Sequence, residues 1–317
     1  KNEVNLISCD NNYNIFELFD HNTSSHRSYN TNNGGYSVTS SNPNVVNFDG
    51  RVKCGSKAGE AIITIKQAQN DYYEATTFSQ TFYVIRRDRN GTMLIKDANE
   101  WKLFCKLVNE KGLTALNARL DGDVDLGGDI AMVGTNNHNY SGTFDGGEHT
   151  LTLNWNAGSG HWKSPFYTVE NATISNLRVK GQIKSVGKGH TGLIQNAYGT
   201  VTVSGCVSDV DITCVDNVDE CSAAGMIQWV GSDAKVNFND CLVKGSINAT
   251  TDKGKKGMGG FVYDQRGTCT LTNCLYIGTN NATGGYTFAK NATFNNCYYL
   301  TACGEAQGKQ VTKEQLR

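Results

Sequence analysis

The sequence predicts an all-β protein in which a β-sandwich is followed by a parallel β-helix. The composition is typical of short strands joined by tight turns, with Gly 35 and Pro 2 among 317 residues. Short alternating segments fill the first part of the chain, and from Ala172 onward the sequence repeats itself. We therefore predict two domains, at residues 1–87 and 88–317.

The charge of the chain is nearly balanced, with a formal net charge of −1. Such a balance gives no strong electrostatic field that would favour nucleic acid or an anionic membrane. No apolar run in the sequence is long enough to span a bilayer. We expect no nucleic-acid partner and no membrane-spanning segment in this chain.

In the first domain, apolar residues alternate with polar ones along several short segments. They lie at 36–38, 45–48, 61–65 and 78–84. Several short strands at this spacing, separated by turn signals, are typical of a β-sandwich. Cys9 and Cys54 could form a disulfide here, although the sequence fixes no geometry for the pair.

The segment VTSSNPNVVNFDGRVKCGSKAGEAIITI resembles the bacterial immunoglobulin-like (Ig-like) domains of Gram-negative surface proteins. The SNP turn and the strand of pattern AG-x-A-x-I-x-I carry the resemblance, which covers roughly Tyr36 to Ile85. It implies an Ig-like β-sandwich that acts as a spacer or stalk and has no catalytic role.

One helix is expected, at about residues 97–111. Asp97 and Glu100 have the spacing of a capping box, and Trp101 and Phe104 begin an apolar stripe at helical spacing. A short amphipathic helix ahead of a β-rich run must bury this stripe. The open end of the β-structure is the place to bury it, because an exposed sheet edge needs covering. We expect this helix to cap the β-helix.

Two sequence anchors recur together in the second half of the chain. One is a cysteine after a small polar residue, and the other is a glycine followed by apolar residues, as in GLIQ, GMIQ, GFVY and GYTF. The repeats of roughly 30 residues lack a helical period and are too short and uneven for propeller blades. A parallel β-helix fits best, with coils at about 115–303. The C-terminal tail at 304–317 is either the start of one more helix or a truncated continuation of the coils.

The recurring cysteine is predicted to be a core position of this β-helix. Leucine takes its place in the first repeat, and a buried free cysteine behaves as a small apolar residue. No C-x₂₋₄-C pair accompanies it, which disfavours zinc. The predicted core ladder consists of Leu177, Cys206, Cys241, Cys274 and Cys297. Away from this ladder, Cys214 and Cys221 could close a loop.

The second domain resembles bacterial surface β-helices that carry GLUG-like repeats. The resemblance rests on IKDANEWKLFCKLVNEKG, ARLDGDVDLGG, YSGTFDGGEHTLTLNW and SPFYTVENATISNLRVKGQI, together with the Gly-Leu-Ile and Gly-Phe-Val anchors. It implies a right-handed β-helix on an exported, cell-surface, adhesin-like protein. It supplies no catalytic residues for this sequence, and no cofactor is expected.

Three aspartates in LDGDVDLGG form a weak candidate for calcium binding. Asp121, Asp123 and Asp125 alternate, so on a strand they would share one face. An EF-hand loop would require Gly where Leu126 stands and Glu where Met132 stands. A solvated strand face is therefore the favoured interpretation, and no metal is expected.

Tryptophan and histidine side chains provide the best candidates for ligand binding. Trp155, His161 and Trp162 surround a glycine-rich loop, and Trp229 lies beside a repeat anchor. Sugar rings stack on such aromatic faces, and large exposed rings are costly unless they pack or bind. Rings folded back onto the first coil are nevertheless the favoured interpretation.

The sequence as a whole predicts a non-enzymatic, exported surface protein for adhesion or ligand binding, with a glycan or a host or surface protein as its partner. The alternative is a polysaccharide lyase or glycoside hydrolase acting in a groove of the β-helix. Asp209 and Asp211, two residues apart, are the carboxylate candidates for that chemistry. A third interpretation is a structural spacer.

Overall fold

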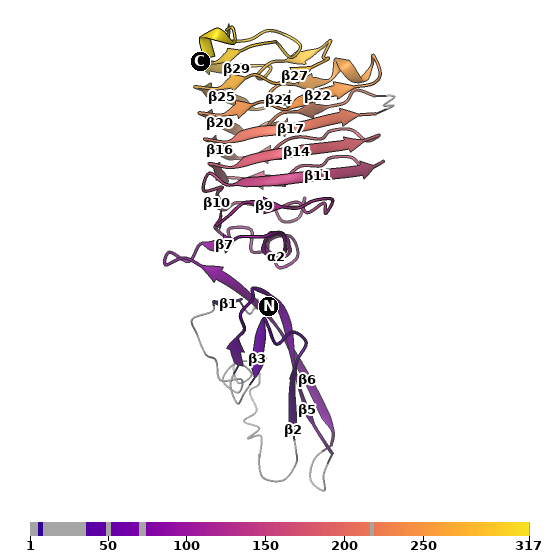
Figure 1. Cartoon of the computed structure of the whole chain (residues 1–317), viewed down its shortest axis with the longest axis vertical. Coiled ribbons are helices and arrows are strands. Elements are labelled where there is room, and N and C mark those ends of the chain that lie inside the picture. The colour runs from indigo at the N-terminus through magenta and orange to yellow at the C-terminus, as the bar shows by residue number, and fades with distance from the viewer. Residues whose placement is uncertain (1–5, 9–35, 49–51, 70–73, 216–218, 317) are drawn as a thin grey trace. The chain divides into compact units, whose positions relative to one another are not determined.

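The computed structural model describes residues 6–8, 36–48, 52–69, 74–215 and 219–316 (Figure 1). Of these residues 48% lie in β-strands and 7% in helices, and the sheets of the larger unit are parallel, so the all-β prediction is confirmed. The chain forms two compact units, Lys1–Leu94 and Ile95–Arg317. The boundary follows Leu94 rather than residue 87, because the segment after Arg87 turns back to pair with strand β6.

The first unit is built mainly from antiparallel strands. β5 pairs with β2 on one side and β6 on the other, β3 pairs with β4, and β1 pairs with β6 in parallel. The strands are β1 (Leu6–Ser8), β2 (Tyr36–Ser40), β3 (Val46–Phe48), β4 (Val52–Cys54), β5 (Gly59–Gln67), β6 (Thr76–Arg87) and β7 (Met93–Ile95).

Alternation of apolar side chains along these strands builds the core of the first unit. Ile63 and Ile65 of β5 face Val45 and Phe82 across a cluster of buried aliphatic and aromatic residues. The period of two places them on one face of the sheet, as the sequence pattern predicts. The proposed pairing of Cys9 with Cys54 lies outside the described residues, since Cys9 is not among them.

The second unit begins with helix α2 (Ala98–Asn109), which has Asp97 as its N-cap. Asp97 Oδ1 accepts a hydrogen bond of 3.0 Å from the backbone N–H of Glu100. The Glu100 carboxylate accepts from the N–H of Lys96, at 2.8 Å, just before the N-cap residue. On the apolar side, the Trp101 ring meets Phe144 edge-on, with centroids 5.7 Å apart.

Parallel strands follow the helix and are stacked in layers (Figure 1). Each turn of the chain adds one strand to each of several sheets. The first sheet consists of β8 (Ala118–Leu120), β10 (Thr143–Asp145), β13 (Thr173–Ser175), β16 (Thr200–Ser204), β20 (Lys235–Asn239), β25 (Thr268–Thr272) and β29 (Ala292–Asn295). Its pairing registers align one buried residue per strand, namely Ala118, Phe144, Ile174, Val203, Phe238, Leu271 and Phe294, of which the last is partly buried.

The other sheets run alongside the first. The second contains β9 (Val124–Asp125), β11 (Thr150–Gly158), β14 (Arg178–Ser185), β17 (Val207–Cys214), β21 (Leu242–Val243), β22 (Ser246–Ala249), β26 (Leu275–Tyr276), β27 (Thr279–Asn280), β30 (Tyr298–Tyr299) and β31 (Lys309–Gln310). The third contains β12 (Phe166–Glu170), β15 (Ile194–Tyr198), β19 (Ile227–Val230) and β24 (Val262–Gln265). The smallest contains β18 (Ala223–Ala224), β23 (Met258–Gly259) and β28 (Gly285–Tyr286), and a 3₁₀ turn, η1 (Gly254–Lys256), precedes β23.

The small polar residue before each ladder position makes a sharp turn in the left-handed region. These residues are Asn176, Gly205, Asp240, Asn273 and Asn296, with φ between 51° and 61°. Glycine, asparagine and aspartate are the residues that adopt this region at low cost. Side-chain hydrogen bonds join neighbouring coils along this row, for example 2.9 Å from Asn273 Nδ2 to Asp240 Oδ1. The turn explains why an Asn, Asp or Gly precedes each ladder cysteine.

Within the described residues, the C-terminal tail adds a strand, β31, and a 3₁₀ turn. Strand β31 pairs in parallel with β30, and η2 (Glu314–Leu316) is a single turn. The N–H groups of Lys309 and Val311 donate to the carbonyls of Cys297 and Tyr299, both at 2.9 Å. Backbone pairing with the last coil therefore overrides the helical propensity of this segment.

Candidate functional site

A groove of about 370 Å³ lies on the third sheet and touches all four of its strands. Its volume falls in the range of small-ligand sites. Four aromatic rings, four amide side chains and one carboxylate line it: Trp162, Tyr167, Tyr198 and Trp229; Asn136, Gln195, Asn196 and Gln228; and Asp264. Two of these residues, Trp162 and Trp229, are among the four ligand candidates that the sequence predicted.

Trp162 enters the groove from the loop between β11 and β12. Its backbone has φ 59, a left-handed conformation that is rare for a bulky residue. The Trp162 N–H donates to the Lys188 carbonyl at 2.9 Å, which holds the turn. The ring covers Gly189 so closely that a Cβ there would overlap it. Outliers of this kind cluster at binding sites, where the surrounding structure maintains the strain.

Trp229 lies on β19, between Asn196 of β15 and Asp264 of β24, with which it is in register. The Arg266 guanidinium carbon lies 5.2 Å from the centroid of the Trp229 ring. The Nε atom of the same arginine lies 3.5 Å from Asp264 Oδ1. Arg266 therefore contacts both the Trp229 ring and the Asp264 carboxylate.

The amides of Gln195 and Gln228 form a polar pair within the groove lining. Gln195, which is 1% exposed, donates from Nε2 to Gln228 Oε1 at 3.0 Å. Its own Oε1 is buried and has no hydrogen-bond partner. Buried carbonyl oxygens are almost always paired, so an unpaired one in the lining of a groove requires an explanation.

The other two predicted ligand residues lie apart from the groove. Trp155 is buried, with 1% exposure, and its Nε1 donates to the Asp129 carbonyl at 2.9 Å. It is a core residue, which corrects its assignment as a ligand contact. His161 is exposed and accepts from the Lys188 N–H through Nδ1 at 3.0 Å, and it does not line the groove.

Sequence reasoning missed the amide residues of this site. Gln195 and Gln228 end the anchors GLIQ and GMIQ, so the same polar residue recurs at one position of two successive repeats. Ile194 and Ile227, which precede them, are in register on β15 and β19. A polar residue that recurs inside an otherwise apolar anchor was the available signal.

The three aspartates of the calcium candidate do not share a strand. Asp121 lies in the bend after β8, whereas Asp125 belongs to β9. Asp123 Oδ1 accepts from the Thr150 N–H at 2.8 Å, and Asp125 Oδ1 accepts from the Gly127 N–H at 2.8 Å. The bend breaks the alternation on which the prediction of a common face rested. Within the described ranges, no group of three or more His, Cys, Asp or Glu side chains could hold a metal ion.

Asp209 and Asp211, the carboxylate candidates for hydrolysis, lie on β17 in the second sheet and not in the groove. Asp209 Oδ2 forms an ion pair of 2.9 Å with Lys244 Nζ. Asp211 Oδ1 accepts from the N–H of Ser246 at 2.9 Å and from its hydroxyl at 2.7 Å. Both carboxylates therefore link neighbouring coils.

The predicted ladder residues Leu177, Cys206, Cys241, Cys274 and Cys297 are all buried and lie on successive coils. Backbone bonds connect them, as from the N–H of Leu275 to the carbonyl of Cys241, at 2.9 Å. Burial raises the pKa of the Cys206 thiol to about 12. Protonated thiols are poor nucleophiles and poor metal ligands.

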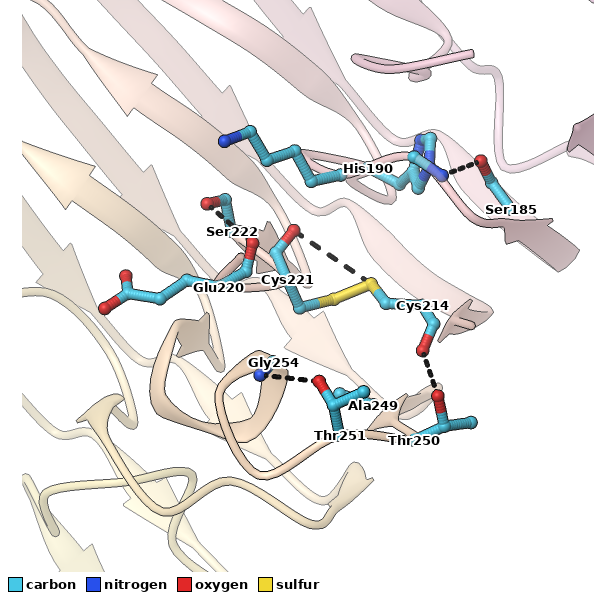
Figure 2. Close-up of a disulfide and its surroundings, with 12 residues drawn as sticks. Ser185, His190, Cys214, Glu220, Cys221, Ser222, Ala249, Thr250, Thr251 and Gly254 are labelled. Atoms are coloured by element: carbon cyan, nitrogen blue, oxygen red, sulfur yellow. Dashed lines mark hydrogen bonds between the residues drawn. A yellow bond between two sulfur atoms is a disulfide. The ribbon is translucent and has the colours of Figure 1, made fainter. Parts of the chain in front are cut away.

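Cys214 and Cys221 form a disulfide, as the sequence allowed (Figure 2). The Cys221 carbonyl accepts from the N–H of Gly189 at 2.8 Å. Gly189 is the residue that the Trp162 ring covers. The disulfide thus holds, through one backbone bond, the surface against which a groove ring rests.

No family model matches the chain, and no curated protein matches it significantly. No helix within the described ranges has both the length and the apolar character needed to cross a bilayer.

Proposed function

We propose that the chain is a non-enzymatic, exported, adhesin-like surface protein that binds a glycan in the groove of the third sheet. In this proposal the first unit is an Ig-like β-sandwich that serves as a spacer. The second unit is a right-handed parallel β-helix, and α2 caps its N-terminal end. The binding proposal rests on one observation: Trp162 and Trp229 line the same groove, together with amide side chains.

Aromatic and amide residues together suit a sugar better than an apolar ligand. A pyranose ring presents C–H groups on its faces and hydroxyls around its rim. Rings such as Trp229 offer a flat apolar surface, while Asn196 and Gln228 offer donors and acceptors beside it. Shallow clefts of this kind combine apolar contact with a few placed polar groups.

We propose binding rather than cleavage because the described groove lining contains one carboxylate and not two. A glycoside hydrolase of the usual type requires two of them across the scissile bond. Among the described groove residues, Asp264 is the one carboxylate, and it lies 3.5 Å from the Arg266 Nε. Asp209 and Asp211 belong to another sheet.

A glycan array probed with the wild-type protein and a Trp229→Ala variant tests the proposal. Loss of a central tryptophan contact commonly costs about 2 kcal/mol or more, so we expect affinity to fall roughly 30-fold. The His161→Ala variant is the matched control, because His161 lies on the same loop as Trp162 but outside the groove lining. Thermal melting confirms that each variant is folded.

Binding that is lost in Trp229→Ala and retained in His161→Ala supports the proposal. Equal binding by both variants refutes the groove as the site. Turnover of a polysaccharide would instead identify an enzyme. If the array shows neither binding nor turnover, the spacer interpretation stands.

A further inference from the structure

One buried oxygen in the groove lining, Gln195 Oε1, has no hydrogen-bond partner. The Gln195 side chain is fixed, because its Nε2 donates to Gln228 Oε1 at 3.0 Å. The same bond leaves Gln195 Oε1 as the amide atom without a partner. An amide oxygen only accepts hydrogen bonds, so the missing partner is a donor such as a hydroxyl or an N–H.

Gln228 has a donor, its Nε2 amide group, for which a ligand could supply the acceptor. Its Oε1 is used by Gln195, and its Nε2 makes no hydrogen bond to any described residue. The groove lining therefore contains one buried acceptor without a partner and one donor without a partner, on adjacent coils. Sugar hydroxyls satisfy both, since a hydroxyl donates one hydrogen bond and accepts others.

The charges beside the groove determine which class of sugar fits. Asp264 is the carboxylate among the lining residues, and Arg266 lies between it and the Trp229 ring. The remaining lining residues carry amide, phenol and indole groups and include no lysine, arginine or histidine. A carboxylated sugar would meet the negative charge of Asp264 without an uncommitted cation in the lining to pair with it.

We propose that the groove recognises a neutral sugar ring, with Gln195 Oε1 accepting a hydrogen bond from a ligand hydroxyl or N–H while Trp229 supplies the stacking face. This inference rests on the proposed glycan binding and adds the ligand class and a residue that determines specificity. Sites built to hydrogen-bond a ligand group discriminate strongly against ligands that lack it.

The test compares neutral and acidic members of matched pairs on one array. The probes are lactose with sialyllactose, and methyl-esterified oligogalacturonate with oligogalacturonate. Affinity for the strongest binder is then measured by calorimetry for wild type, Gln195→Met, Gln265→Met and Trp229→Ala. Methionine keeps the length of the side chain and removes both amide atoms, so Gln195→Met loses the acceptor Oε1 and the bond to Gln228 and its folding is also verified by melting.

Gln265 provides the matched control, because its Oε1 is also buried and unpartnered but the residue lies outside the groove lining. Gln265→Met loses bonds to the carbonyls of Gly267 and Asn291, so its folding is verified by melting. We expect preference for the neutral members, about a tenfold loss of affinity in Gln195→Met and unchanged affinity in Gln265→Met.

Three results overturn the inference, in distinguishable ways. Preference for acidic members that disappears in Trp229→Ala refutes the neutral ligand class and leaves glycan binding in the groove intact. Neutral binding with equal affinity in wild type and Gln195→Met refutes the role of Gln195. Absence of binding to every glycan refutes the proposed function itself, and the inference with it.

Discussion

Gly225 is the position where a single added methyl group tests the stacking of the coils most sharply. It is the glycine of the GMIQ anchor, and an ideal Cβ there would overlap the carbonyl oxygen of Gly260 on the next coil and lie 2.7 Å from a methyl carbon of Val243. Its φ lies outside the left-handed region, so alanine suits its backbone conformation. The cost of Gly225→Ala is therefore one of packing.

The magnitude follows from three terms. Overpacking a close contact costs about 1–3 kcal/mol. The N–H of Gly225 donates to the carbonyls of Gly259 and Gly260, both at 3.1 Å, and loss of this shared bond costs about 1 kcal/mol. The lower entropy of the unfolded chain returns about 0.5–1 kcal/mol. We expect a net destabilisation of about 2 kcal/mol, or roughly 4–8 °C in melting temperature for a unit of this size.

Thermal unfolding followed by circular dichroism measures this effect, with Gly122→Ala as the control. A Cβ at Gly122 would meet its nearest neighbour, the Lys96 carbonyl, at an ordinary 3.8 Å. The control is expected to stay within about 0.5 kcal/mol of wild type. Equal melting temperatures for Gly225→Ala and Gly122→Ala would refute the close approach of successive coils.

Three further predictions concern titration and covalent chemistry. Burial lowers the pKa of His190 to about 4, below its unfolded value of 6.5. The free energy of unfolding is therefore full above pH 6.5 and falls by about 3 kcal/mol as the pH drops to 4. Urea titrations across this window should show the loss, and His190→Gln should make the free energy of unfolding less dependent on pH. Burial raises the pKa of the Cys206 thiol from 9.0 to about 12, so its alkylation by iodoacetamide at pH 8 should be about a thousandfold slower than that of an exposed thiol. Rapid labelling of Cys206 in the native protein, measured by mass spectrometry, would contradict its burial. Reduction of the disulfide between Cys214 and Cys221, which are 7 residues apart, should destabilise the protein by roughly 2 kcal/mol, and an unchanged melting temperature after verified reduction would oppose this estimate.

The repeat anchors in the sequence were sufficient to predict the stacked parallel strands of the second unit. Cys241 and Cys274 recur because each coil offers the same buried slot, and a period in the sequence becomes a period in space. The bend at Asp121 was not predictable in this way, since alternating residues do not reveal where a short strand ends. Pairing of the tail through Lys309 with the last coil likewise depends on a distant strand rather than on local propensity.

The groove was only partly predictable from the sequence. Trp162 and Trp229 were identifiable as large aromatic residues near loops and anchors, but nothing local distinguished them from Trp155, which is buried. Their meeting depends on how the Trp162 loop crosses Gly189, a contact between coils. Gln195 matters because its oxygen lacks a partner, which only a three-dimensional arrangement can show.

A crystal structure of the protein with its strongest neutral oligosaccharide tests the glycan-binding proposal most directly. The account predicts a sugar ring stacked on Trp229, with a hydroxyl or N–H donor within about 3.2 Å of Gln195 Oε1. A sugar bound elsewhere, for example beside Lys184 and Val186 at the open depression on the second sheet, would contradict it.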